Sequence, residues 1–177
     1  MTIAVIVYSH GTRLEEILEA VRDRLVARGD LRLGGLLPRL GERLSNGRLA
    51  LLLDDLARGD TIVISQDLGP GSTGCILDAN GLAQARTRLS ESIGARPDVL
   101  FLGRFGKEEA AGRGIREEIG EAAMGAIACI IAVEEKILPA WIDFAGEDFT
   151  RLPAQVEAIL AWADGIHPAP ARAGSTA

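Results

Sequence analysis

Three polar segments carry residue types suited to binding a small anion, and each follows a run of strand-forming residues. The longest, SQDLGPGSTGC over 65–75, combines three glycines with hydroxyl groups and a carboxylate. Glycine allows positive φ angles and brings backbone N–H groups close to a ligand. A hairpin-closing turn needs one or two such residues, so the segment favours binding over a purely connecting role. The candidate binding residues in it are Gln66, Asp67, Gly69, Gly71, Ser72, Thr73 and Gly74.

The first polar segment, SHGTR over 9–13, leads from an apolar run into a helical pattern. Backbone N–H groups and the helix dipole favour an anion at such a turn. A phosphate-binding P-loop reads GxxxxGK[ST], whereas this segment has one glycine and no lysine. A tight turn capped by Thr12 is therefore the alternative, and His10 would either serve an anion or proton or merely fill space. The candidate residues here are Ser9, His10, Gly11, Thr12 and Arg13.

The third segment, RFGKEEAAGRG over 104–114, places two basic candidates, Lys107 and Arg113, among glycines before a helix. Backbone N–H groups together with a guanidinium fork suit a phosphate or another oxyanion. In the alternative interpretation, Glu108 and Glu109 pair with these bases and the segment is a solvated ionic loop.

Alternating strand and helix patterns connect the three segments. The sequence predicts buried strands at 3–8, 31–37, 98–103 and 126–133, and a hairpin from 48–55 and 60–65, with an irregular connection over 38–47. It predicts helices at 12–28, 79–93, 115–124, 138–144 and 153–162, the last with Pro153 in its first turn. This order indicates an α/β fold: a mainly parallel sheet flanked by helices, with a β-hairpin insertion. Ligands of such sheets bind beyond the carboxyl ends of the strands, where the polar segments should lie.

The composition narrows the class of protein. At 177 residues the chain suits one α/β domain, expected over 1–163, followed by a disordered tail over 164–177. The net charge of −6 argues against nucleic-acid binding. No stretch approaches the roughly 18 apolar residues of a membrane span, and no signal peptide is recognisable, so we expect no membrane insertion and a cytoplasmic location. Cys75 and Cys129 are too isolated for a disulfide framework or a cysteine metal cluster.

The order SQDLGPGSTGC-x-LD, then a strand, then FGK-x-EA-x-GRG resembles an uncharacterised bacterial family, domain of unknown function 2478, over roughly 3–162. The resemblance implies a relative of the P-loop nucleoside triphosphatases with a degenerate P-loop, often associated with genes for molybdenum uptake or use. The triphosphatase lysine is missing from Gly11-Thr12-Arg13, and Gly103-Arg104 replaces the acidic magnesium-binding pair. A bound Mg²⁺ and ordinary hydrolysis are therefore unexpected.

These observations predict a protein that binds a small anion, either a nucleotide or an oxyanion such as molybdate. One alternative is a divergent nucleoside triphosphatase or nucleotide kinase in which Arg13 or Lys107 replaces the missing lysine. In that case Asp67 or Asp78 would hold the metal. The other alternative is a regulatory partner of a transporter or of a cofactor-assembly enzyme, and a homodimer is also compatible with the sequence.

Overall fold

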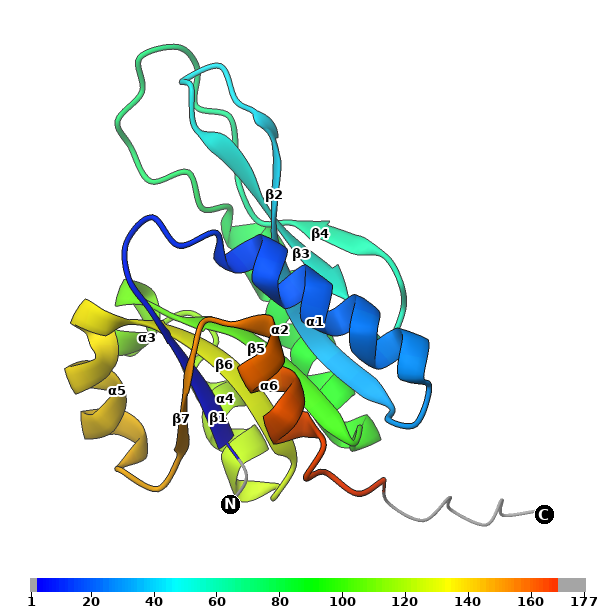
Figure 1. Cartoon of the computed structure of the whole chain (residues 1–177). Coiled ribbons are helices and arrows are strands. Elements are labelled where there is room, and N and C mark those ends of the chain that lie inside the picture. The colour runs from blue at the N-terminus through cyan, green and yellow to red at the C-terminus, as the bar shows by residue number, and fades with distance from the viewer. Residues whose placement is uncertain (1–2, 169–177) are drawn as a thin grey trace.

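A computed structural model describes residues 3–168, and all of its strands form one seven-stranded sheet (Figure 1). The strands are β1 (Ile3–Tyr8), β2 (Leu33–Arg43), β3 (Leu49–Asp55), β4 (Thr61–Val63), β5 (Val99–Phe105), β6 (Ala128–Glu134) and β7 (Thr150–Pro153). Their order is β4-β3-β2-β5-β6-β1-β7. The pairs from β2 to β7 are parallel, whereas β3 is antiparallel to both β2 and β4. The predicted α/β fold with a mainly parallel sheet and a hairpin insertion is confirmed.

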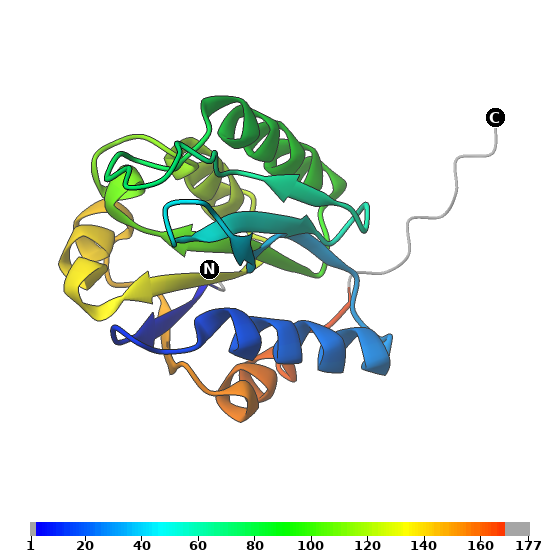
Figure 2. The same ribbon diagram turned by 90° about the horizontal axis from the view of Figure 1, so that it is seen from above.

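Helices cover both faces of the sheet. They are α1 (Leu14–Arg28), α2 (Ala79–Ala95), α3 (Lys107–Ala110), α4 (Arg116–Met124), α5 (Leu138–Ala145) and α6 (Val156–Ala163). Figure 2 shows α1 and α6 on one face and α2 and α4 on the other. Each face has its own apolar core, with Leu18 of α1 in one and Leu89 of α2 in the other. Within residues 3–168, no helix is long and apolar enough to cross a membrane.

The irregular connection predicted over 38–47 is wrong for its first six residues, because β2 continues to Arg43 and pairs with β3. Pro38 and Gly41 suggested a break in the sequence. However, β2 pairs with β5 only as far as Leu36, and beyond that point the β5 side of β2 is unpaired. A proline there removes no ladder hydrogen bond on that side. The β2–β3 hairpin therefore projects beyond the rest of the sheet (Figure 1).

A glycine pair sets the contact between β2 and β5. Gly35 has a φ of +89°, and a Cβ at this position would overlap the carbonyl oxygen of Phe101. Only glycine permits this backbone conformation together with so close an approach. The GG of LRLGGLLP thus fixes where the hairpin leaves the parallel sheet.

Two predicted helix starts need correction. Thr12 does not cap α1: the cap position is Arg13, and no side chain there bonds the helix. The last helix starts at Val156 rather than at the predicted proline, since Pro153 ends the unpredicted strand β7. By contrast, α2 has a side-chain cap, because the Asp78 carboxylate accepts a hydrogen bond from the N–H of Gly81 at 2.7 Å.

The chain after α6 still contacts the domain. Asp164 accepts a hydrogen bond from Arg28 at 2.7 Å, and Ile166 packs against the core on the α1 face. Of the predicted tail, residues 169–177 lie outside the described part of the chain.

Candidate functional site

A cavity of about 480 Å³ opens at the carboxyl edge of the sheet, between the β2–β3 hairpin and the segment that follows β5. Its volume is within the range of about 300–1,000 Å³ that small-molecule sites occupy. Most of its wall is aliphatic, formed by Leu36, Pro38, Leu40, Leu51, Leu52, Leu53, Ile64, Leu77, Leu82, Leu102 and Ile115. The charged lining residues are Glu15, Arg39, Arg104, Lys107, Glu108, Glu109 and Glu134.

One wall of the cavity comes from the hairpin. The cross-strand pairs Pro38–Leu53 and Leu40–Leu51 line it, and each places two apolar side chains opposite one another. Leu36, at the base, is 2% exposed, whereas Leu40 is 40% exposed. We call these five residues the leucine wall; it runs from the core into solvent.

The polar end of the cavity contains an ion pair between Arg104, near the end of β5, and Glu15, in the first turn of α1. The Arg104 guanidinium also lies over the ring of Tyr8, 5.9 Å from its centroid. Burial raises the pKa of the Tyr8 hydroxyl, and the nearby guanidinium partly opposes this shift. The Nε of Arg104 is buried and has no hydrogen-bond partner among residues 3–168. The Arg104 side chain lines the cavity, but this unpaired Nε is shielded from the solvent in it.

In the third predicted segment, backbone donors bind a carboxylate of the chain itself. Glu109 accepts hydrogen bonds from the N–H groups of Gly106 at 2.9 Å and Ile115 at 3.2 Å. Arg113 donates to both carboxylate oxygens of Glu108, at 2.8 and 3.3 Å. The Arg113 hydrogen bond, with its charge, holds the pKa of Glu108 below its ordinary range. Arg113 therefore forms the ion pair that the alternative interpretation of this segment predicts.

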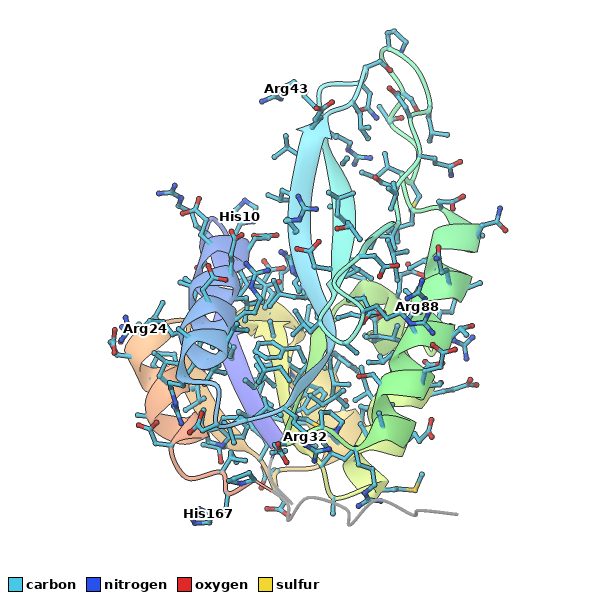
Figure 3. The ribbon with its side chains drawn as sticks, turned by 90° about the vertical axis from the view of Figure 1, so that its right-hand side faces the viewer. His10, Arg24, Arg32, Arg43, Arg88 and His167 are labelled. Carbon is cyan, nitrogen blue, oxygen red and sulfur yellow. The ribbon has the colours of Figure 1, made fainter. Side chains whose placement is uncertain are left out.

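The longest predicted segment is tied to the tip of the hairpin. Asp67 accepts hydrogen bonds from the N–H and hydroxyl of Ser45 and from the N–H of Gly69, and these bonds lower the pKa of its carboxyl. Arg48 donates to the carbonyl of Gly74 at 2.8 Å. We call residues 40–50 and 66–75 together the arm; it extends past the sheet edge, with Arg43 near its tip (Figure 3). The predicted residues of 66–74 do not line the cavity.

The first predicted segment forms a short turn. The N–H of Thr12 donates to the carbonyl of Ser9 at 3.1 Å, and Gly11 has a φ of +86°. Arg13 pairs with Glu16 at 2.7 Å, on the exposed side of α1. His10 is exposed at the same end of the helix (Figure 3). The five candidate residues of this turn do not line the cavity either.

Of the predicted site residues, only Lys107 lines the cavity. It is the first residue of α3, is exposed, and forms no ion pair within residues 3–168. Besides the two glutamates expected to pair with bases, sequence reasoning left four charged lining residues out of the site: Glu15, Arg39, Arg104 and Glu134. The available signal was positional, because Arg104 and Glu134 each stand near the end of an apolar strand, where a charged residue interrupts the apolar run.

The order of the parallel strands, with β1 leading through a tight turn into α1, defines a P-loop NTPase-like α/β fold. A crystal structure of THEP1 from the hyperthermophile Aquifex aeolicus has this fold and aligns with a TM-score of 0.64 at 11% sequence identity. The alignment covers 93% of this chain and 96% of that one. The model of the family "Protein of unknown function (DUF2478)" matches residues 3–162. The chain belongs to this family.

A curated relative is the molybdenum import ATP-binding protein ModC 2 of Bradyrhizobium diazoefficiens, which is 36% identical over 160 residues. The match covers 90% of this chain but only 18% of that protein. The chain therefore spans less than a fifth of the length of the relative that it matches.

The residues at the polar end do not fit the magnesium–nucleotide site that this fold implies. Phosphoryl transfer in the class uses a P-loop lysine and a carboxylate-held Mg²⁺. Here the P-loop position is the turn at 9–13 without lysine, and a guanidinium, Arg104, stands near the end of β5. Its positive charge repels a cation, and Glu15, the adjacent carboxylate, is already bound to it. We derive no hydrolytic step from this site.

Proposed function

We propose that this protein is a small-anion-binding domain that does not hydrolyse its ligand, with the cavity as its site. Nucleotides and oxyanions such as molybdate are the candidate ligands. The observation that carries the proposal is Lys107, a cation that lines the cavity and forms no ion pair within residues 3–168. Lys107 is exposed and unpaired in the described part of the chain, so an anion that enters the cavity can reach its ammonium without first displacing a carboxylate.

A role in molybdenum transport or use is part of the proposal. It is supported by the relative whose name describes molybdenum import, since the shared segment covers nearly all of this chain. We propose that the domain acts in the cytoplasm beside such a system.

The second candidate function is regulatory contact with a transporter or cofactor-assembly protein. It is favoured by the same relative, in which the matching segment makes up 18% of a much longer protein. Within the arm, Leu49 and Leu68 are 37% and 42% exposed and are available for such a contact.

A ligand screen separates the two candidates. Thermal unfolding is measured with ATP, GTP, molybdate, tungstate, sulfate and phosphate, with and without Mg²⁺, and each ligand that raises the midpoint is titrated calorimetrically. The binding proposal predicts that at least one anion raises the unfolding midpoint, whether or not Mg²⁺ is present. Lys107→Ala should weaken its affinity about tenfold, the loss expected for one charge-assisted hydrogen bond. Arg24→Ala is the matched control, because Arg24 lies on α1 away from the cavity and is 60% exposed.

Three results would overturn the proposal or part of it. If no anion raises the unfolding midpoint, regulatory contact is favoured as the function. Equal affinities for wild type and Lys107→Ala would exclude the cavity as the site. Mg²⁺-dependent release of phosphate from ATP or GTP would establish the hydrolase alternative.

A further inference from the structure

We infer that the anion this cavity takes is amphipathic: an apolar body lies on the leucine wall, and a single anionic group meets Arg104 and Lys107. The inference rests on the proposed function and names the class of ligand. A free tetrahedral oxyanion is then a poor ligand, and so is a nucleoside triphosphate.

The leucine wall offers a ligand an aliphatic surface. Pro38, Leu53, Leu40 and Leu51 face the cavity as two cross-strand pairs, and Leu102 closes it from β5. Aliphatic side chains offer no hydrogen bond to a hydrated ion, and removing its water beside them is unfavourable. A ring or an acyl chain, in contrast, is stabilised by every apolar surface that it covers.

Two cationic residues that are three positions apart in the sequence, Arg104 and Lys107, line the same cavity. Arg104 lines the cavity, and its side chain is 37% exposed, so a ligand can reach the guanidinium although the Nε itself is buried. Lys107 lines it from the start of α3 and forms no ion pair in the described chain. Two donors that differ in shape suit one carboxylate, sulfonate or phosphate group.

Neighbouring carboxylates limit the ligand to one anionic group. Glu15 is bound to Arg104, Glu108 to Arg113, and Glu134 to Lys136 at 2.6 Å, and all three carboxylates line the cavity. A chain of several phosphates would face these negative charges with only one unpaired cation to offset them. The ligand must also compete with Glu15 for the Arg104 guanidinium, so Glu15 acts as an internal competitor.

The test uses 1-anilinonaphthalene-8-sulfonate, which has an apolar ring system and one sulfonate. Binding to the whole chain is followed by fluorescence and then reversed with octanoate, AMP, acetate or molybdate. We expect octanoate or AMP to displace the probe at concentrations at least about tenfold below those of acetate and molybdate, which lack an apolar body.

Two pairs of variants assign the probe to this cavity. Leu40→Gln and Leu68→Gln make the same chemical change at side chains of similar exposure, 40% and 42%, but only Leu40 lines the cavity. Leu40→Gln should weaken probe binding about fivefold and Leu68→Gln should leave it unchanged. Lys107→Gln should weaken binding, whereas Glu15→Gln should tighten it because the competitor loses its charge. Circular dichroism checks that each variant is folded.

The outcomes distinguish this inference from the proposed function. If acetate or molybdate displaces the probe as readily as octanoate and AMP do, the amphipathic class is overturned while anion binding stands. If Leu40→Gln and Leu68→Gln behave alike, or if Glu15→Gln weakens binding, the assigned site is overturned. If Lys107→Gln changes neither probe binding nor that of any anion, the proposed function itself fails.

Discussion

The guanidinium of Arg104 binds the carboxylate of Glu15 across the gap between the end of β5 and the first turn of α1. A helix N-terminus and a nearby cation together form a favourable place for an anion. In this chain a side chain of the protein occupies that place. The Arg104 guanidinium is therefore neutralised internally, and an external ligand that binds it has to exchange with Glu15.

The Arg104–Glu15 pair should contribute measurably to folding. Its side chains are 37% and 17% exposed, so it is better shielded from water than a typical surface pair. We expect a coupling free energy of about 1 kcal/mol from a double-mutant cycle of Glu15→Ala and Arg104→Ala. Urea unfolding of the single and double variants measures it. Strictly additive losses would show that the two side chains do not interact in solution.

The loop around α3 should depend on Gly114. Gly112 and Gly114 both have positive φ, but only at Gly114 would a Cβ overlap the carboxylate of Glu109. We expect Gly112→Ala to cost about 1 kcal/mol through backbone strain. Gly114→Ala should cost about 2 kcal/mol, because it also displaces a cap-like hydrogen-bonded carboxylate. Chemical unfolding of both variants measures the difference.

The control for this prediction is Glu109→Ala, which removes the carboxylate that the new methyl group would meet. In that background the two glycine substitutions should cost the same. If Gly114→Ala still lowered the free energy of unfolding more than Gly112→Ala in this background, contact with the Glu109 carboxylate would not be the cause.

The arm should loosen in acid. Hydrogen bonds from the Ser45 side chain and backbone, and from the Gly69 N–H, lower the pKa of the Asp67 carboxyl in the folded state. The stabilisation is therefore complete above the unfolded pKa of about 3.9, and it is lost as the pH falls through the lower folded value. The Ser45 amide resonance, followed by NMR against pH, should titrate with a midpoint below about 3.9. A midpoint at or above that value would contradict the hydrogen bonds at Asp67.

The two cysteines should differ sharply in reactivity. Cys75 is exposed in the arm, whereas Cys129 is buried in β6, where burial raises the pKa of its thiol to about 12. The thiolate is the reactive species. A thiol-disulfide reagent at neutral pH should therefore modify Cys75 rapidly in the folded protein and Cys129 only on unfolding. Rapid modification of both cysteines in the folded protein would contradict the burial of Cys129. Rapid modification of neither would contradict the exposure of Cys75.

Much of the fold was predictable from local patterns. Apolar runs such as 3–8 and 98–103 alternate with amphipathic stretches, and short buried strands between helices permit few arrangements other than a parallel sheet. The length of β2 was not predictable in this way. Pro38 is compatible with a strand only because β5 is no longer paired beside it, and that is a property of the assembled sheet.

The candidate site was less predictable. Glycine, hydroxyl and basic residues correctly marked polar loops at the carboxyl edge of the sheet, but composition does not reveal what a donor binds. In the folded chain carboxylates of the protein take up donors that were assigned to a ligand from the sequence. Asp67 accepts from the Gly69 N–H, Glu109 from the Gly106 N–H and Glu108 from Arg113. Which base stays unpaired depends on side-chain packing, and Lys107 could not be distinguished from Arg113 before the structure was known.

The central claim is that an anion binds beside Lys107, and the chain allows a direct test because it has only two lysines, Lys107 and Lys136. Acylation by a lysine-selective reagent is quantified at each site by peptide mass spectrometry, with and without the anion that scores best in the screen and without Mg²⁺. We predict that the bound anion slows acylation of Lys107 at least about fivefold, as it forms a charge-assisted contact. Lys136, which is already paired with Glu134, should react at an unchanged rate. Equal protection of both lysines, or protection of neither at a saturating concentration, would contradict the claim.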